Sequence, residues 1–213
     1  MSGKYKLEGK NVIIAVNMLE TVTKIFEDVE LKYVLDCGTL LGIYREDRLL
    51  PWDNDMDLSI FCDDEKRIKN VIKKIKKAGY IVKIRYQEKE DYPLEFKKIR
   101  ILKIYNRKNF FAKGEVMLDC FMVKRGDNQY VCAYGGLNHY TKIHIPTRFY
   151  ETVDHLNFKG KQYSIPSYIE EYLTHRYGNW KIPISDGSWD YRKDDGSIVF
   201  SQIKNNEKTA GPT

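Results

Sequence analysis

The segment 116–123, Val-Met-Leu-Asp-Cys-Phe-Met-Val, restricts the possible fold more than any other part of the chain. All of its residues except Asp119 are apolar, and such a run is typical of a strand that is covered on both faces of a sheet. An unpaired charge buried in this strand would be very costly. We therefore expect a central strand in which Asp119 lies beside groups that compensate its charge.

The rest of the chain mixes helical and strand patterns. The spacing of apolar residues predicts amphipathic helices at 11–30 and 64–78, and a third, shorter helix at 168–177 ends at Gly178. Further strands are expected at 33–35, 56–61, 81–86, 96–105 and 129–134, with short strands and loops from 143 to 165. Residues 39–44 are expected to form one or two helical turns, and 45–54 a loop. Since helices and strands do not alternate regularly, the pattern indicates a mixed α/β or α+β domain.

The length of 213 residues favours one domain, which we place at 1–204, followed by a small polar tail at 205–213 that is expected to be disordered. The chain contains no run of about 18 apolar residues and no apolar segment typical of a signal peptide. The four cysteines form no C-x-x-C pair, so we expect reduced thiols. These features favour a cytoplasmic protein with at most a peripheral association with a membrane.

A group of carboxylates stands where the strand at 56–61 begins. Asp53, Asp55 and Asp57 alternate along the sequence, and residues two apart on a strand point to the same side. If the strand with Asp119 is its neighbour, the two backbones are about 4.8 Å apart and Asp119 completes a cluster with Asp55 and Asp57. Oxygen ligands of this kind suit Mg²⁺ or Mn²⁺. Asp53 is equally well explained as a residue that caps the loop or as one that supports the metal ligands without binding the metal itself.

A possible phosphate-binding element precedes these carboxylates. Gly38 and Thr39 follow a predicted strand and come before a helical turn. A glycine there lets backbone amides approach a phosphate, and the N-terminus of a helix favours its negative charge. We therefore expect Gly38 and Thr39 to bind phosphate.

These motifs together resemble the LicD family, which includes bacterial phosphocholine transferases and fukutin-type ribitol-phosphate transferases. The resemblance covers roughly residues 10 to 185, and its segments are 38–42 (Gly-Thr-Leu-Leu-Gly) with Arg45, 51–57 (Pro-Trp-Asp-Asn-Asp-Met-Asp), 96–100, 116–121, 165–166, 171–173 and 176–180. It implies a nucleotidyltransferase-like mixed sheet flanked by helices. It also implies transfer of a phospho-alcohol from a CDP-activated donor to a sugar hydroxyl of a cell-surface glycan.

Roles for individual residues follow from this resemblance. Asp55 and Asp57 would bind the metal that bridges the donor pyrophosphate, and Asp119 would share the metal or accept the proton of the attacking hydroxyl. Arg45, Lys98 and Arg100 would neutralise charge that develops during transfer. Trp52 either forms a wall of the site or packs under its loop, and packing is favoured. Apart from the resemblance, the aromatic residues Tyr134, Tyr140 and Trp180 could line a sugar or base pocket. His139 is more readily explained as a loop or surface residue, although it could reach a site.

Two alternatives remain at this point. One is transfer of a nucleoside monophosphate from a nucleoside triphosphate to a small molecule or protein. The other is a non-catalytic module that binds an anionic partner, because the net charge is +6 and one face of the helix at 64–78 is rich in lysine. That face is more readily explained as a solvated surface, and no motif supports sequence-specific binding of nucleic acid.

Overall fold

The computed structural model describes residues 5–109, 112–135, 140–184 and 188–198. The predicted tail at 205–213 and His139 lie outside this part of the chain. Helices and strands follow one another in the order α1 (Lys10–Glu27), β1 (Lys32–Leu35), α2 (Cys37–Glu46), β2 (Met56–Phe61), α3 (Glu65–Lys77), β3 (Ile81–Tyr86), β4 (Ile99–Arg107), β5 (Lys113–Arg125), β6 (Gln129–Gly135), β7 (Tyr140–Pro146), a 3₁₀ turn (Thr147–Phe149), β8 (Val153–Phe158), β9 (Lys161–Pro166) and α4 (Ile169–Tyr177). None of the described helices combines the length and the apolar character needed to cross a membrane.

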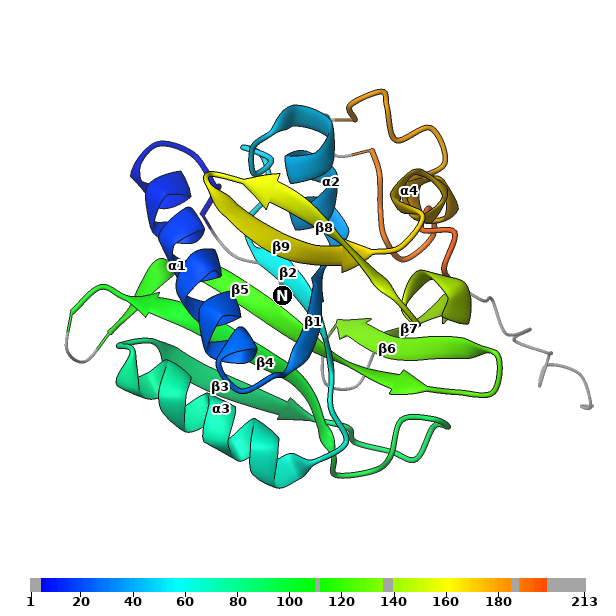
Figure 1. Cartoon of the computed structure of the whole chain (residues 1–213), viewed down its shortest axis with the longest axis horizontal. Coiled ribbons are helices and arrows are strands. Elements are labelled where there is room, and N and C mark those ends of the chain that lie inside the picture. Colours follow the sequence, from blue (N-terminus) through cyan, green and yellow to red (C-terminus); the bar gives the residue numbers. More distant parts are fainter. Residues whose placement is uncertain (1–4, 110–111, 136–139, 185–187, 199–213) are drawn as a thin grey trace, which may run out of the picture.

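A mixed sheet forms the centre of the molecule (Figure 1). Five strands lie in the order β1-β2-β5-β4-β3, and β6 and β7 continue from β5. β2 and β5 run parallel, while β1 pairs with β2, β4 with β5, and β3 with β4 in antiparallel fashion. This arrangement confirms the predicted mixed α/β class and the central position of the strand that carries Asp119.

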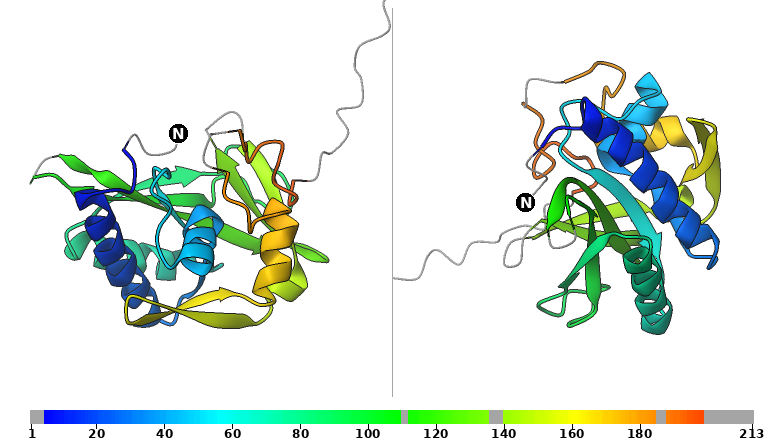
Figure 2. Two further views of the ribbon diagram at one scale, coloured as in Figure 1. Left: turned by 90° about the horizontal axis from the view of Figure 1, so that it is seen from above. Right: turned by 90° about the vertical axis from the view of Figure 1, so that its left-hand side faces the viewer.

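Helices α1 and α3 cross one face of this sheet (Figures 1 and 2). The apolar stripe of α1 includes Met18, Leu19 and Phe26, and that of α3 includes Ile68 and Ile75; all are buried. Each such side chain contributes roughly 1.5–3 kcal/mol when it leaves water. Asp64 caps α3 by accepting the N–H of Lys66 at 2.8 Å, as its position before the apolar stripe suggests.

The neighbouring strands β2, β5 and β4 have an apolar face and a face that carries charged residues. Side chains alternate along each strand, so Leu58, Leu102 and Cys120 are buried in the core under the helices. The intervening residues, with Asp57 and Asp119 in direct register on β2 and β5, line a cavity. The fold therefore separates an apolar face from a face that carries charge.

Candidate active site

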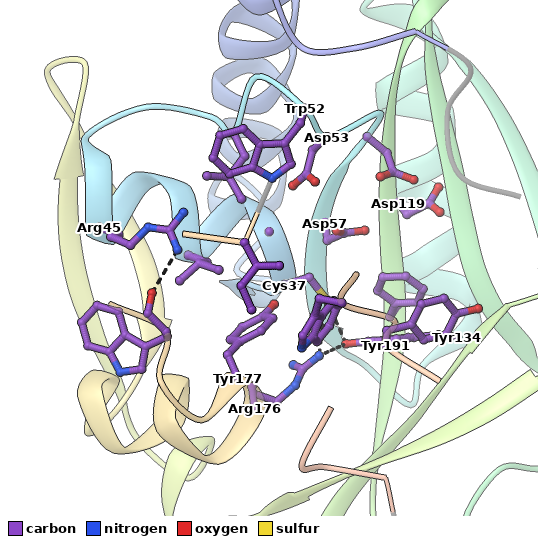
Figure 3. Close-up of a pocket in the computed structure, with 18 of the residues that line it drawn as sticks. Cys37, Arg45, Trp52, Asp53, Asp57, Asp119, Tyr134, Arg176, Tyr177 and Tyr191 are labelled. Atoms are coloured by element: carbon purple, nitrogen blue, oxygen red, sulfur yellow. Dashed lines mark hydrogen bonds between the residues drawn. The ribbon is translucent and has the colours of Figure 1, made fainter. Parts of the chain in front are cut away.

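The predicted carboxylate cluster is present at the floor of this cavity. Asp57 and Asp119 are paired residues of parallel strands, and Asp55 stands just before β2. One carboxylate oxygen from each of the three residues lies within 4.8 Å of the others. In Figure 3, Asp57 and Asp119 lie at one end of the cavity, which has a volume of about 310 Å³.

Burial makes three negative charges at this place unfavourable. Desolvation, followed by repulsion from Asp55 and Asp119, raises the pKa of Asp57 well above its usual value. Desolvation also raises the pKa of Asp119, although Lys103 opposes the shift. The Oδ1 atom of Asp119 is buried and has no hydrogen-bond partner among the described residues. Three hard oxygen donors, one of them lacking a partner, fit a divalent cation such as Mg²⁺ or Mn²⁺.

Lys103 is a site residue that the sequence analysis missed. It lies on β4 in register with Asp119, its side chain is buried, and its ammonium group forms an ion pair with Asp119 Oδ2. The available signal was a single cation within the otherwise apolar run 101–104 on a predicted strand. Without the pairing of β4 and β5, nothing related that cation to Asp119.

The N-terminus of α2 borders the same cavity. Asp36 caps the helix by accepting the N–H of Cys37 at 2.7 Å, and Gly38 lines the cavity. A Cβ atom on Gly38 would lie 2.0 Å from Asp53 Oδ2, so any larger residue here would force the Asp53 side chain to move. Thr39 does not line the cavity, because it is buried and its Oγ1 accepts the N–H of Asp57 at 2.8 Å. The prediction that the Thr39 hydroxyl binds phosphate therefore gives way to a role in joining α2 to β2.

The loop before β2 contributes Trp52 and Asp53 to the cavity lining. Desolvation raises the pKa of Asp53 to about 6, and Arg45 opposes the shift. Arg45 also lines the cavity, where its guanidinium binds the Glu46 carboxylate and donates to the Trp180 carbonyl at 2.9 Å (Figure 3). Arg45 is thus a largely buried cation of the cavity wall rather than a surface cation.

Lys98 and Arg100 do not line this cavity. Lys98 precedes β4, is 43% exposed and forms an ion pair with Glu65 of α3 at 3.5 Å. Arg100 is buried and donates to the carbonyl of Ala133 at 3.2 Å. The expectation that both cations face the site fails because β4 begins at Ile99 rather than at residue 96, which places Lys98 in the preceding turn.

A buried network of charges centres on Arg176, which itself lines the cavity, and this network was not predicted. Arg176 donates to Asp36 Oδ1 at 2.9 Å and to both carboxylate oxygens of Asp195 at 2.7–3.0 Å. Asp36 also accepts the hydroxyl groups of Ser59 and Tyr172, both at 2.5 Å. Burial acts to raise the pKa of Asp36, but Arg176 and these hydroxyl groups outweigh it, and the net pKa is lowered.

Aromatic side chains form much of the cavity wall: in Figure 3, Tyr134, Tyr177 and Tyr191 lie away from Asp53, whereas Trp52 lies beside it. Tyr134 and Tyr191 pack with ring centroids 6.2 Å apart, and Tyr177 and Trp189 with centroids 5.1 Å apart. Two of the predicted pocket aromatics, Tyr134 and Trp180, line the cavity. Tyr140 does not line it, because it binds Gln87 and Asp91 at 2.8 Å outside it.

Other charged and reactive groups lie outside the cavity or are inert. The lysines of α3 are exposed and do not line the cavity, as the solvated-surface interpretation expects. All four cysteines are free thiols in the structure. Cys37 reaches the cavity, and burial followed by the charge of Asp36 raises the pKa of its thiol well above the usual value, so it is a poor nucleophile.

Comparison with known proteins adds independent information. Ribitol-5-phosphate transferase FKTN of Mus musculus is 28% identical over 178 residues, which span 82% of this chain and 35% of that protein. The human protein of the same name is 28% identical, over 84% of this chain and 35% of its own length. An uncharacterised protein of Rickettsia prowazekii (strain Madrid E) is 24% identical, over 83% of this chain and 59% of that protein. This chain thus corresponds to less than two thirds of the length of these relatives.

A solved structure of ANT(2")-Ia in complex with adenylyl-2"-tobramycin aligns with a TM-score of 0.41 and 15% identity, over 71% of this chain and 68% of that one. The family model described as "LicD/FKTN/FKRP, nucleotidyltransferase domain" matches residues 30–168, which contain the α2 N-terminus and all three clustered carboxylates. The chain therefore belongs to the LicD/FKTN/FKRP nucleotidyltransferase-domain family.

Proposed function

We propose that this protein is a metal-dependent transferase that moves a phospho-alcohol from a CDP-activated donor to a sugar hydroxyl of a glycan. The observation that carries the proposal is the convergence of Asp55, Asp57 and Asp119 beside the N-terminus of a helix in one cavity. Family membership and the similarity to ribitol-5-phosphate transferases support the same reaction class. The alcohol is of the choline, glycerol or ribitol type.

The bonds exchanged in this reaction are defined by the donor. The oxygen of the acceptor hydroxyl forms a bond to the phosphorus that carries the alcohol. The bond between that phosphorus and the oxygen bridging to CMP breaks, and CMP leaves with the electron pair. Asp119 is the carboxylate that either shares the cation or accepts the proton of the hydroxyl.

Each side of the cavity has a task in this proposal. Asp55, Asp57 and Asp119 would hold Mg²⁺ or Mn²⁺, which when bound supplies positive charge to the phosphate oxygens. The backbone amides at the start of α2, next to Gly38, would bind a donor phosphate. Arg45 would add positive charge at the wall, and its ties to Glu46 and the Trp180 carbonyl would keep the guanidinium in place.

The aromatic part of the cavity would bind a ring of the substrate, either the cytosine base or the acceptor sugar. Tyr177, Trp180, Trp189 and Tyr191 all follow residue 168, where the match to the family model ends. Because these residues lie outside the part of the chain that matches the family model, we expect them to contribute to substrate specificity. These aromatic residues would therefore determine which base or which acceptor sugar is bound, rather than the chemistry of transfer.

A product analysis tests the proposal. The protein is incubated with Mg²⁺, a glycan acceptor and, separately, CDP-ribitol, CDP-glycerol, CDP-choline, ATP or CTP. The proposal predicts release of CMP from at least one CDP-alcohol and transfer of the alcohol phosphate to the acceptor. Release of pyrophosphate from a triphosphate, with a nucleoside monophosphate left on the acceptor, would instead support nucleotidyl transfer, the activity for which the matched domain is named.

A further inference from the structure

Lys103 occupies a special position among the cations of this protein. A row of paired residues crosses the sheet from Asp57 on β2 to Asp119 on β5 and Lys103 on β4. Lys103 is 5% exposed and lines the cavity whose floor carries the three carboxylates. Burial of an ammonium group costs free energy unless the group is paired, so the partners of the Lys103 ammonium group indicate its function.

Those contacts are selective. Of the three clustered carboxylates, the described ion pair of Lys103 is with Asp119, and it uses Oδ2. The remaining polar contact of its ammonium is with Met117 Sδ at 3.8 Å, a weak acceptor. Lys103 therefore holds one defined oxygen of one defined carboxylate.

The two oxygens of Asp119 consequently differ. Oδ2 is engaged by Lys103, whereas Oδ1 is buried and has no hydrogen-bond partner within the described chain. A buried acceptor without a partner is unusual in folded proteins and calls for an explanation such as a bound ion. Oδ1 belongs to a residue whose carboxylate already lies within the three-carboxylate cluster.

We propose that Lys103 is a positioning residue, whose ion pair with Oδ2 orients the Asp119 carboxylate and reserves Oδ1 for the cation held with Asp55 and Asp57. The proposal rests on the metal-dependent function proposed above and refines it. It assigns Asp119 to the cation rather than to proton transfer, because both of its oxygens are then engaged. Groups that orient metal ligands commonly change metal affinity or activity by about 10–100-fold when they are removed.

Binding of Mn²⁺ alone tests this role without any substrate. Free Mn²⁺ is measured by electron paramagnetic resonance during titration of the full chain. Lys103→Met, which has a similar length and no charge, is expected to weaken Mn²⁺ binding about 10–100-fold. Lys103→Arg keeps the cation and should stay close to the unchanged protein. Lys98→Met is the matched control, since Lys98 lies outside the cavity, and its affinity should equal that of the unchanged protein.

A double-mutant cycle separates positioning from other roles of Lys103. If Lys103 acts through Asp119, then Lys103→Met causes no further loss of Mn²⁺ affinity in a protein that already carries Asp119→Asn. Equal losses in both backgrounds would overturn the proposal, as would an unchanged or increased affinity of Lys103→Met. Thermal unfolding checks that each variant is folded. If Lys103→Met does not fold, Lys103→Gln is used instead, because glutamine removes the charge but keeps an N–H donor. Lys103→Gln is expected to weaken Mn²⁺ binding severalfold, and an unchanged Mn²⁺ affinity would overturn the proposal.

The outcomes also distinguish this proposal from the proposed function. Mn²⁺ binding by the unchanged protein, together with full binding by Lys103→Met, refutes the role of Lys103 and leaves the metal-dependent reaction standing. Failure of the unchanged protein to bind Mn²⁺ refutes both. A loss confined to Lys103→Met and cancelled by Asp119→Asn supports both the role of Lys103 and the metal site.

Discussion

Replacement of Arg176 by methionine is expected to destabilise the fold strongly. The Arg176 side chain is 1% exposed and joins two carboxylates that are themselves fully buried, Asp36 at the N-terminal cap of α2 and Asp195 near the end of the described chain. It also donates to the hydroxyl groups of Tyr172 at 2.8 Å and Tyr134 at 3.3 Å. Methionine fills a similar volume but leaves both carboxylates without their counter-charge.

The magnitude follows from the burial of this pair. Removal of one partner of a buried ion pair costs about 3–5 kcal/mol, because the remaining charge stays uncompensated. That is a large part of the roughly 5–15 kcal/mol by which a domain is stable. For a chain of this size, 1 kcal/mol shifts the melting temperature by about 2–4 °C, so the expected decrease is about 6–20 °C.

Urea unfolding followed by circular dichroism measures the loss of free energy, and calorimetry measures the melting temperature. Arg192→Met serves as the matched control, because Arg192 is 67% exposed and pairs with Asp190 at the surface. Its effect should stay within about 0.5 kcal/mol. A loss below about 1 kcal/mol in Arg176→Met would refute the reasoning, since it would mean that Asp36 and Asp195 need no counter-charge.

Three further predictions concern the cavity itself. Gly38→Ala is expected to lower the rate of transfer at least about tenfold in a folded protein, because its Cβ displaces the Asp53 carboxylate; full activity in a steady-state assay would contradict this. The metal-free protein is expected to become more stable as the pH falls from about 7.5 to 5.5, because the pKa of Asp53 is about 6 in the folded state and lower in the unfolded state. Melting curves of Asp53→Asn should show a smaller gain over the same pH range. An equal gain in Asp53→Asn would refute the raised pKa of Asp53. Asp119→Asn is expected to lower kcat at least about 10–100-fold, because the cation loses one of its three carboxylate ligands; a variant that only loses stability would assign Asp119 to structure alone.

The floor of the site could be predicted from the sequence because it depends on local patterns. Alternation of Asp55 and Asp57 at a strand start, and an isolated charge in the apolar run around Asp119, were sufficient to suggest one cluster. This prediction required that the two strands be neighbours, and in the structure they are paired, with Asp57 and Asp119 in register. The alternation of side chains along a strand predicts which residues share a face. The one long-range assumption was therefore that these two strands pair.

The basic residues could not be assigned in the same way. Lys98 and Arg100 belong to a strand predicted to begin at residue 96, but Lys97 adopts a left-handed conformation with φ of 62° and the strand starts at Ile99. The register between β3 and β4 then shifts, since Arg85 pairs with Ile101 and Tyr86 with Ile99. Arg100 is the extra residue of this irregularity, and no local pattern predicts such a bulge.

Contacts between distant segments account for the remainder. Arg176 and Asp36 are 140 residues apart in sequence. Tyr177, Trp180, Trp189 and Tyr191 meet the residues of the sheet only in the folded chain. The importance of Lys103 likewise depends on the pairing of β4 with β5. These features arise from chain topology, which helical and strand periodicity does not determine.

Asp57→Asn offers a direct test of whether the carboxylate cluster binds the cation required for phosphoryl transfer. The change removes one charge at the centre of the cluster and preserves the volume of the side chain. In an assay with a CDP-alcohol, Mg²⁺ and an acceptor, we predict that the unchanged protein releases CMP, that chelation of the metal stops the release and that added Mg²⁺ restores it. We predict no detectable CMP release by Asp57→Asn with the fold intact. Full CMP release by Asp57→Asn, or release that persists without a divalent cation, would show that the cluster does not hold a required cation.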